Sequence, residues 1–80
     1  MIKVYQLKDE SGNYFAGGSP FVVVDGNGNE VLFSYFTEIM ARKADGRMTR
    51  AWDDWTWTTG RHIKAFCGLC KKDFLELKQN

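Results

Sequence analysis

The stretch that decides the fold of this chain is residues 21–35, which read FVVVDGNGNEVLFSY. Two apolar runs, rich in β-branched and aromatic side chains, flank the Asp-Gly-Asn-Gly-Asn segment at residues 25–29. Glycine and asparagine tolerate the positive φ angles that tight turns require, so this segment predicts a β-hairpin. Its glycines do not have the G-x-x-x-x-G-K spacing of a phosphate-binding loop, and a hairpin turn explains them.

The segment before this hairpin predicts two more strands. Residues 1–8 place alternate side chains in the order expected of a strand, and residues 9–13 supply a turn containing Gly and Asn. Residues 14–16, Tyr-Phe-Ala, predict a short second strand. The Gly-Gly-Ser-Pro sequence at residues 17–20 then ends that strand.

Residues 36–52 carry two conflicting signals. The spacing of Phe36, Ile39, Met40 and Lys43 predicts a short helix, which Ser34 or Thr37 could cap and Gly46 could close. The Asp45-Gly46 pair instead predicts a hairpin with a two-residue type I′ turn. In that register Ile39 lies opposite Trp52, Ala41 opposite Arg50 and Lys43 opposite Met48. The hairpin would place Arg42, Arg47 and Thr49 together on its other, basic face.

The end of the chain predicts helix. Thr58 or Thr59 could cap a helix that starts near Gly60, Gly68 could interrupt it, and residues 71–77 resume helical spacing. The expected fold is therefore α+β: a small antiparallel sheet of four to six strands with a C-terminal helix packed on one face. Residues 1–80 form a single domain, because the chain has no linker, repeat or low-complexity segment.

Composition and charge limit the kind of protein. The 80 residues include 12 aromatic ones, which supply much apolar area for a small core. The longest apolar run is too short to cross a bilayer, and the N-terminus has no signal-peptide layout, so we expect a cytoplasmic protein that does not use a membrane. The net charge of +1 is divided unevenly. Residues 1–41 hold two basic and five acidic residues, hence −3, and residues 42–80 hold nine basic and five acidic ones, hence +4.

No set of residues predicts catalysis or a complete metal site. Cys67 and Cys70 have the C-x-x-C spacing of a zinc knuckle, but His62 is the only histidine that could join them, and a closed site needs four ligands. We expect structural thiols, with a metal or redox role as the alternatives. His62 has no nucleophile and carboxylate in a recognised motif around it, and Asp53-Asp54 fits a turn or helix cap. We therefore expect neither an enzyme nor a cofactor, and no small-molecule substrate.

A cluster of aromatic and basic residues forms the candidate binding site. Three tryptophans lie within six residues of one another, between two arginines, and so small a domain has little room to bury all of them. Exposed tryptophan beside arginine is typical of protein interfaces and of platforms for single-stranded nucleic acid, while core packing is the alternative. The predicted contact surface consists of Arg42, Arg47, Arg50, Trp52, Trp55, Trp57 and Arg61.

Two motifs resemble a known group of proteins. Phe33, Ser34, Tyr35, Thr37 and Ile39 form F-S-Y-x-T-x-I, and W-x-x-T-T-x-x-H-I-x-x-F consists of Trp55, Thr58, Thr59, His62, Ile63 and Phe66. The region 31–67 is similar to small uncharacterised proteins of bacteriophages and mobile elements, in which the middle is a strand pair. That family offers no catalytic residues to carry over.

The resemblance implies a function by analogy. Short phage accessory proteins often bind a host factor, so we expect a non-enzymatic accessory or inhibitor protein in the host cytoplasm. Its partner would be a host protein or nucleoprotein complex, such as a defence nuclease of the kind that anti-CRISPR proteins block. The alternatives are direct nucleic-acid binding through the same basic and aromatic surface, and a small zinc-binding module.

Overall fold

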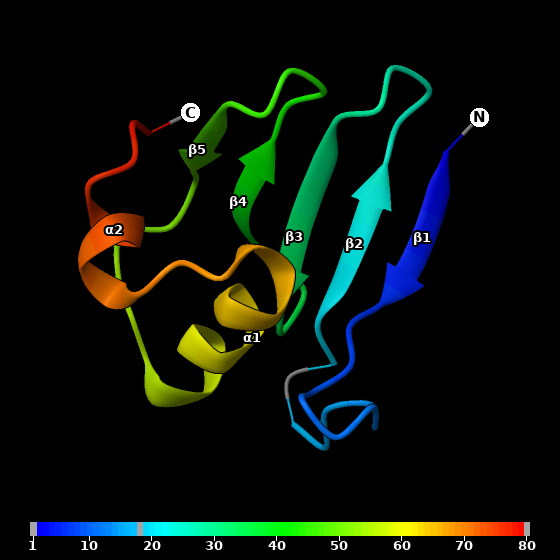
Figure 1. The fold of residues 1–80 in the computed structure, drawn as a ribbon, viewed down its shortest axis with the longest axis vertical. Coiled ribbons are helices and arrows are strands. Elements are labelled where there is room, and N and C mark those ends of the chain that lie inside the picture. Colours follow the sequence, from blue (N-terminus) through cyan, green and yellow to red (C-terminus); the bar gives the residue numbers. More distant parts are fainter. Residues whose placement is uncertain (1, 18, 80) are drawn as a thin grey trace.

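The computed structural model describes residues 2–17 and 19–79 and contains a five-stranded antiparallel sheet followed by two helices (Figure 1). The strands pair in chain order, β1-β2-β3-β4-β5. Short turns join β2 to β3, β3 to β4 and β4 to β5, and a longer loop, residues 7–20, joins β1 to β2. This confirms the predicted α+β class. The strands are β1 (Lys3–Gln6), β2 (Phe21–Val24), β3 (Glu30–Ser34), β4 (Thr37–Arg42) and β5 (Met48–Arg50), and the helices are α1 (Trp57–Cys67) and α2 (Lys71–Leu75).

The β2–β3 hairpin forms as its turn sequence predicts. One carboxylate oxygen of Asp25 accepts hydrogen bonds from the backbone N–H groups of Asn27 and Asn29, at 2.8 and 3.0 Å. Gly28 has a φ of 88°, the left-handed conformation that glycine adopts without steric cost. The turn therefore sets a register in which Val22 lies opposite Leu32.

The middle segment is a hairpin, so the helix alternative for residues 36–52 is wrong, and so is the predicted register. The turn contains three residues, 44–46, with Lys43 N–H donating to the Arg47 carbonyl at 2.7 Å and Gly46 at a φ of 94°. Met40 consequently lies opposite Arg50, and Arg42 opposite Met48. A shift of one residue moves side chains to the other face of a strand pair, so Arg42 does not share a face with Arg47.

The N-terminal region contains one strand rather than two. β1 pairs with β2, but residues 14–16 form no strand, and only an isolated bridge joins Lys8 to Tyr14. The Asp9 carboxylate accepts from the N–H groups of Ser11 and Asn13, which holds the intervening turn. Gly18, in the predicted break, lies outside the described residues.

The first helix begins earlier than predicted. Its cap is Thr56, whose Oγ1 accepts from the Thr59 N–H at 3.1 Å, and not Thr58 or Thr59. This cap places Trp57 on the first turn of the helix. Gly68, at a φ of 79°, ends α1 as predicted, and α2 ends two residues before the predicted Leu77.

In Figure 1, α1 lies over one face of the sheet, in front of β3 and β4, and α2 lies beside the sheet near its β5 edge. The core lies on this helix-covered face and consists of Leu7, Val22, Leu32, Ile39, Met40, Ile63, Phe66 and Phe74. The other face, which we call the open face, carries half-buried side chains such as Val23 and its cross-strand partner Val31. The stacked rings of Phe21 and Phe33, with centroids 5.0 Å apart, lie on this open face as well.

Candidate protein-binding surface

Two of the three predicted tryptophans stabilise the fold. Trp52 and Trp55 are half-buried and pack against the core, and the Trp55 ring lies 5.8 Å from that of Phe74. Gly60 makes room for Trp55, because a Cβ atom at Gly60 would lie only 2.5 Å from Cε2 of the indole. For Trp52 and Trp55, the core-packing alternative therefore fits the structure.

Arg42 contacts other parts of the same chain. Its Nη2 lies 2.9 Å from the Glu30 carboxylate, and its Nε donates to the same oxygen. Its Nη1 donates to the Phe66 carbonyl at 3.3 Å, and the guanidinium lies 4.4 Å from the centre of the Phe66 ring. Arg42 thus joins β3 and β4 to the end of α1.

Arg50 holds the C-terminal segment to β5. Its Nε donates to the Leu77 carbonyl at 3.0 Å, and its backbone N–H donates to the Lys78 carbonyl at 2.8 Å. Arg47 is exposed and pairs with Asp45 at 2.8 Å in the β4–β5 turn. These contacts distribute the predicted arginines over separate parts of the molecule.

Trp57 and Arg61 are the predicted residues that form an exposed pair. The Trp57 side chain is 77% exposed, and the Arg61 guanidinium lies 5.2 Å from the centre of its ring. Arg61 also lies 5.4 Å from the ring of Phe15. The pair therefore forms an outward-facing patch on the first turns of α1.

The sequence did not indicate a second exposed aromatic pair, Tyr35 and Phe36. These residues form the two-residue connection between Ser34 and Thr37, which lie opposite each other at the ends of β3 and β4. Their φ angles are 54° and 61°, and their side chains are 55% and 81% exposed. Two-residue hairpin turns favour Asn-Gly, so the sequence Tyr-Phe does not predict a turn at this position.

The two exposed pairs lie at the same end of the molecule. The β3–β4 turn, the N-terminus of α1 and the loop that follows β1 are all at the lower end in Figure 1, and the β4–β5 turn is at the upper end. Phe15 connects the pairs, because it contacts Arg61 and packs edge-on against His62, which lies 6.3 Å from Tyr35. We call the exposed set Tyr35, Phe36, Trp57 and Arg61 the aromatic tip.

A buried polar cluster supports the aromatic tip. Ser34 Oγ lies 2.8 Å from His62 Nδ1 and 3.4 Å from Thr59 Oγ1, which connects the last residue of β3 to α1. His62 is fully buried, and this burial lowers the pKa of its imidazole. Within the described part of the chain, His62 Nε2 makes no hydrogen bond of standard geometry. An interaction with the Gly17 backbone nevertheless offsets part of the decrease in the pKa of His62.

The two cysteines do not converge on a metal-binding geometry. Cys67 Sγ contacts Met40 Sδ at 3.8 Å and the Ile63 carbonyl at 3.5 Å, and burial raises the pKa of its thiol. Cys70 is exposed beside Asp73. Within residues 2–17 and 19–79, no group of three or more His, Cys, Asp or Glu side chains could hold a metal ion.

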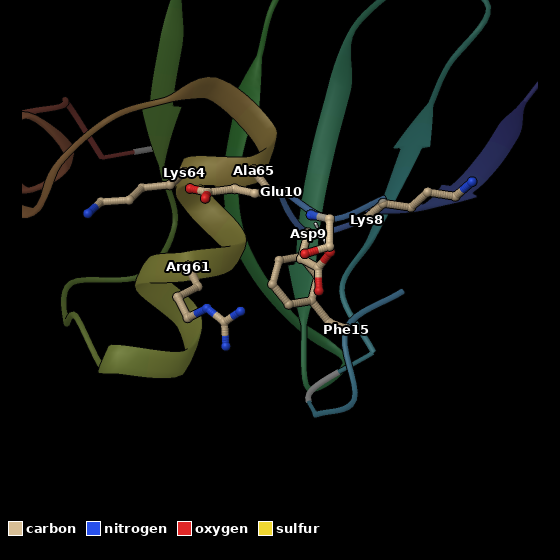
Figure 2. Close-up of a pocket in the computed structure, with 8 residues that line it drawn as sticks. Lys8, Asp9, Glu10, Phe15, Arg61, Lys64 and Ala65 are labelled. Atoms are coloured by element: carbon tan, nitrogen blue, oxygen red, sulfur yellow. Dashed lines mark hydrogen bonds between the residues drawn. The ribbon is translucent and has the colours of Figure 1, made fainter. Parts of the chain in front are cut away.

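A cleft of about 450 Å³ lies between α1 and the loop after β1. Its lining mixes three basic and two acidic side chains with Phe15. Lys8 and Lys64 extend in opposite directions, while the Phe15 ring lies between the loop and α1 (Figure 2). The cations therefore do not converge on a point where a single anion could bind.

The fold and the tip define a small α+β domain with an exposed aromatic end. The chain belongs to a family of unknown function (DUF8033), whose model matches residues 5–79. No curated protein and no solved structure matches it significantly. Neither helix among the described residues has the length and apolar character needed to cross a membrane.

Proposed function

We propose that this chain is a non-enzymatic binding protein that contacts a partner protein through the aromatic tip. Its resemblance to phage and mobile-element proteins supports an accessory or inhibitor role toward a host protein or nucleoprotein complex. The observation that carries the proposal is the pair Tyr35–Phe36, two exposed aromatic residues at positive φ at the same end of the molecule as exposed Trp57.

The β3–β4 turn is costly for the fold. A residue other than glycine held in the left-handed region costs roughly 1–3 kcal/mol, and two consecutive residues of the turn adopt it. Their large exposed side chains recover little of this cost through burial, since Phe36 is 81% exposed. A strained and exposed pair of this kind is explained by a contact with another molecule, which would bury the rings.

The composition of the tip favours a protein partner. Trp, Tyr and Arg dominate the residues that contribute most to protein interfaces, and Arg61 is the single charge among the four tip residues. Nucleic acid needs several cations near the aromatic rings to contact successive phosphates. A basic cleft that includes Lys43, Arg47 and Lys78 lies beside the β4–β5 turn, at the end of the sheet away from the tip.

An affinity capture from a bacterial host lysate tests this proposal. Trp57→Ala should abolish recovery of the partner without changing the melting temperature, because the side chain is largely exposed. Arg47→Ala is the matched control, since it removes an exposed arginine at the other end and should leave recovery unchanged. Recovery by the Trp57→Ala variant would contradict the proposal.

The salt dependence separates the protein partner from nucleic acid. A contact centred on aromatic rings loses little affinity as salt rises, whereas each phosphate contact makes affinity fall steeply. If Arg47→Ala weakened binding and Trp57→Ala did not, binding would lie in the basic cleft, and direct nucleic-acid binding would become the better explanation.

A further inference from the structure

The outer edge of β1 is an open hydrogen-bonding surface. Among residues 2–17 and 19–79, no strand pairs with β1 on the side away from β2. The opposite edge of the sheet is partly covered, because Arg50 of β5 bridges to Gln79. All four residues of β1 are exposed, so an additional strand could approach it.

The direction of each backbone group along β1 follows from one hydrogen bond. The Leu7 N–H donates to the Pro20 carbonyl at 3.1 Å, so Leu7 directs its backbone groups toward the neighbouring segment. Backbone groups alternate in direction along a strand. Lys3 and Tyr5 therefore direct theirs toward β2, and Ile2, Val4 and Gln6 direct theirs outward.

We propose that a second copy of this chain pairs with β1 in an antiparallel arrangement, with Val4 opposite Val4 of the second copy. The two sheets would then form one continuous sheet about a two-fold axis at Val4. In this register the outward backbone groups of Val4 face each other, and those of Ile2 face those of Gln6. Every outward donor in this segment consequently has an acceptor.

The side chains on the helix-covered side complement one another in this register. Lys3 lies opposite Tyr5 of the second copy, and each Tyr5 hydroxyl donates to Glu30 at 3.0 Å. Lys3 has no ion-pair partner among the described residues, so its ammonium group is free to lie over the Tyr5 ring. Lysines on edge strands often prevent strand pairing. Lys3 would instead contact the Tyr5 ring of the second copy, next to the Glu30 carboxylate.

The open face is extended by the same pairing. Val4 is 62% exposed and lies beside Val23, which lies beside Val31 on the open face. Pairing across the axis brings the two Val4 side chains into contact and continues this apolar row into the second copy. A register centred on Tyr5 would instead place Lys3 opposite Leu7, where the chain has left the strand and is buried.

The dimer does not involve the aromatic tip. The tip lies at one end of the strands, and the pairing uses the edge of the sheet (Figure 1). Because the paired strands run in opposite directions, the two tips would be at opposite ends of the joined sheet. Failure of the dimer and failure of tip binding are therefore separate results.

Disulfide trapping tests the register. In a Cys70→Ser background, which removes the exposed native thiol, Val4→Cys should form a disulfide-linked dimer under mild oxidation. Directly opposed residues of a hydrogen-bonded pair have Cα atoms about 5.5 Å apart, within the range that a disulfide spans. Ile2→Cys is the control, because the two Ile2 positions would be offset by four residues, about 13 Å along the strands, and should not form the link.

Sedimentation equilibrium tests the dimer without a cross-link. The wild type should sediment as a dimer, and Val4→Asp should raise its dissociation constant at least tenfold, because two carboxylates would oppose each other at the axis. Ile2→Asp should have a smaller effect, since it opposes Gln6. The exposure of Val4 leaves the monomer folded, which circular dichroism verifies.

Three results would overturn the proposal. The wild type could remain monomeric up to its solubility limit, or Val4→Cys could fail to cross-link more than Ile2→Cys. A dimer that survives Val4→Asp and is lost on Phe33→Asp would place the interface on the open face instead.

Discussion

The hydroxyl of Ser34 and Nδ1 of His62 lie 2.8 Å apart in the interior, with side chains that are almost completely buried. This contact joins the end of β3 to α1 immediately before the strained turn of Tyr35 and Phe36. The turn is therefore anchored at its base even though its side chains face solvent. A rigid base reduces the entropy that the tip would lose on binding a partner.

The stability of the fold should decrease as the pH falls below about 6.5. Burial lowers the pKa of His62 in the folded state below its ordinary value, so between these two values the unfolded chain binds more protons. The stabilisation from the neutral ring is complete above the ordinary pKa and is lost as the pH falls toward the folded pKa. We expect the free energy of unfolding, measured with urea, to fall with pH just below pH 6.5, with a slope of at most about 1.4 kcal/mol per pH unit.

His62→Gln provides the control for this pH dependence, because the chain has only one histidine. The variant should show no slope in this window. The pKa values of Asp25 and Asp45 are lowered by hydrogen bonds from Asn29 and Arg47, so they act in the same direction but only below about pH 4. An NMR titration of the wild-type imidazole with a midpoint at or above 6.5 would refute this explanation.

Two arginine–carboxylate pairs of similar length should differ in their effect on stability. Arg42→Gln should lower the free energy of unfolding by about 1–3 kcal/mol, because it breaks partly buried contacts to Glu30 and to the Phe66 carbonyl. Arg47→Gln removes an exposed pair with Asp45 and should have no measurable effect. Urea unfolding of both variants measures the difference, and equal losses would disprove the linking role of Arg42.

Gly60→Ala should destabilise the protein although alanine favours helices. The new methyl group would overlap the indole of Trp55, and such overpacking costs roughly 1–3 kcal/mol, more than the gain in helix propensity. In a Trp55→Ala background the same change should become neutral or stabilising. Thermal melts of the wild type and the three variants of this cycle test the prediction, and equal costs in both backgrounds would contradict it.

Local turn chemistry made much of the sheet predictable. The segment 25–29 specified its hairpin because Asp25 and Gly28 act through nearby backbone groups. Residues 36–52 could be a helix or a hairpin, because helix propensity and turn chemistry conflict there and only pairing with β3 decides between them. The register was predicted wrongly because Gly46 closes a three-residue turn and not the two-residue turn that Asp-Gly suggests.

The candidate site was less predictable. Trp57 and Arg61, two of the seven predicted residues, form an exposed pair. Trp55 instead packs against Gly60, and Arg42 packs against Phe66, which lies in a distant segment of the chain. Such contacts leave no local pattern in the sequence. Tyr35 was overlooked because its local sequence is misleading: a pair of aromatic residues is typical of a strand and not of a turn.

The most direct test of the central claim replaces the turn pair with the sequence that such turns prefer, in the double variant Tyr35→Asn/Phe36→Gly. The account predicts that relief of backbone strain raises the melting temperature by roughly 4 °C or more, the effect of about 1 kcal/mol in a domain of this size, while partner capture is lost. A variant that melts lower than the wild type, or that still captures the partner, would contradict the account.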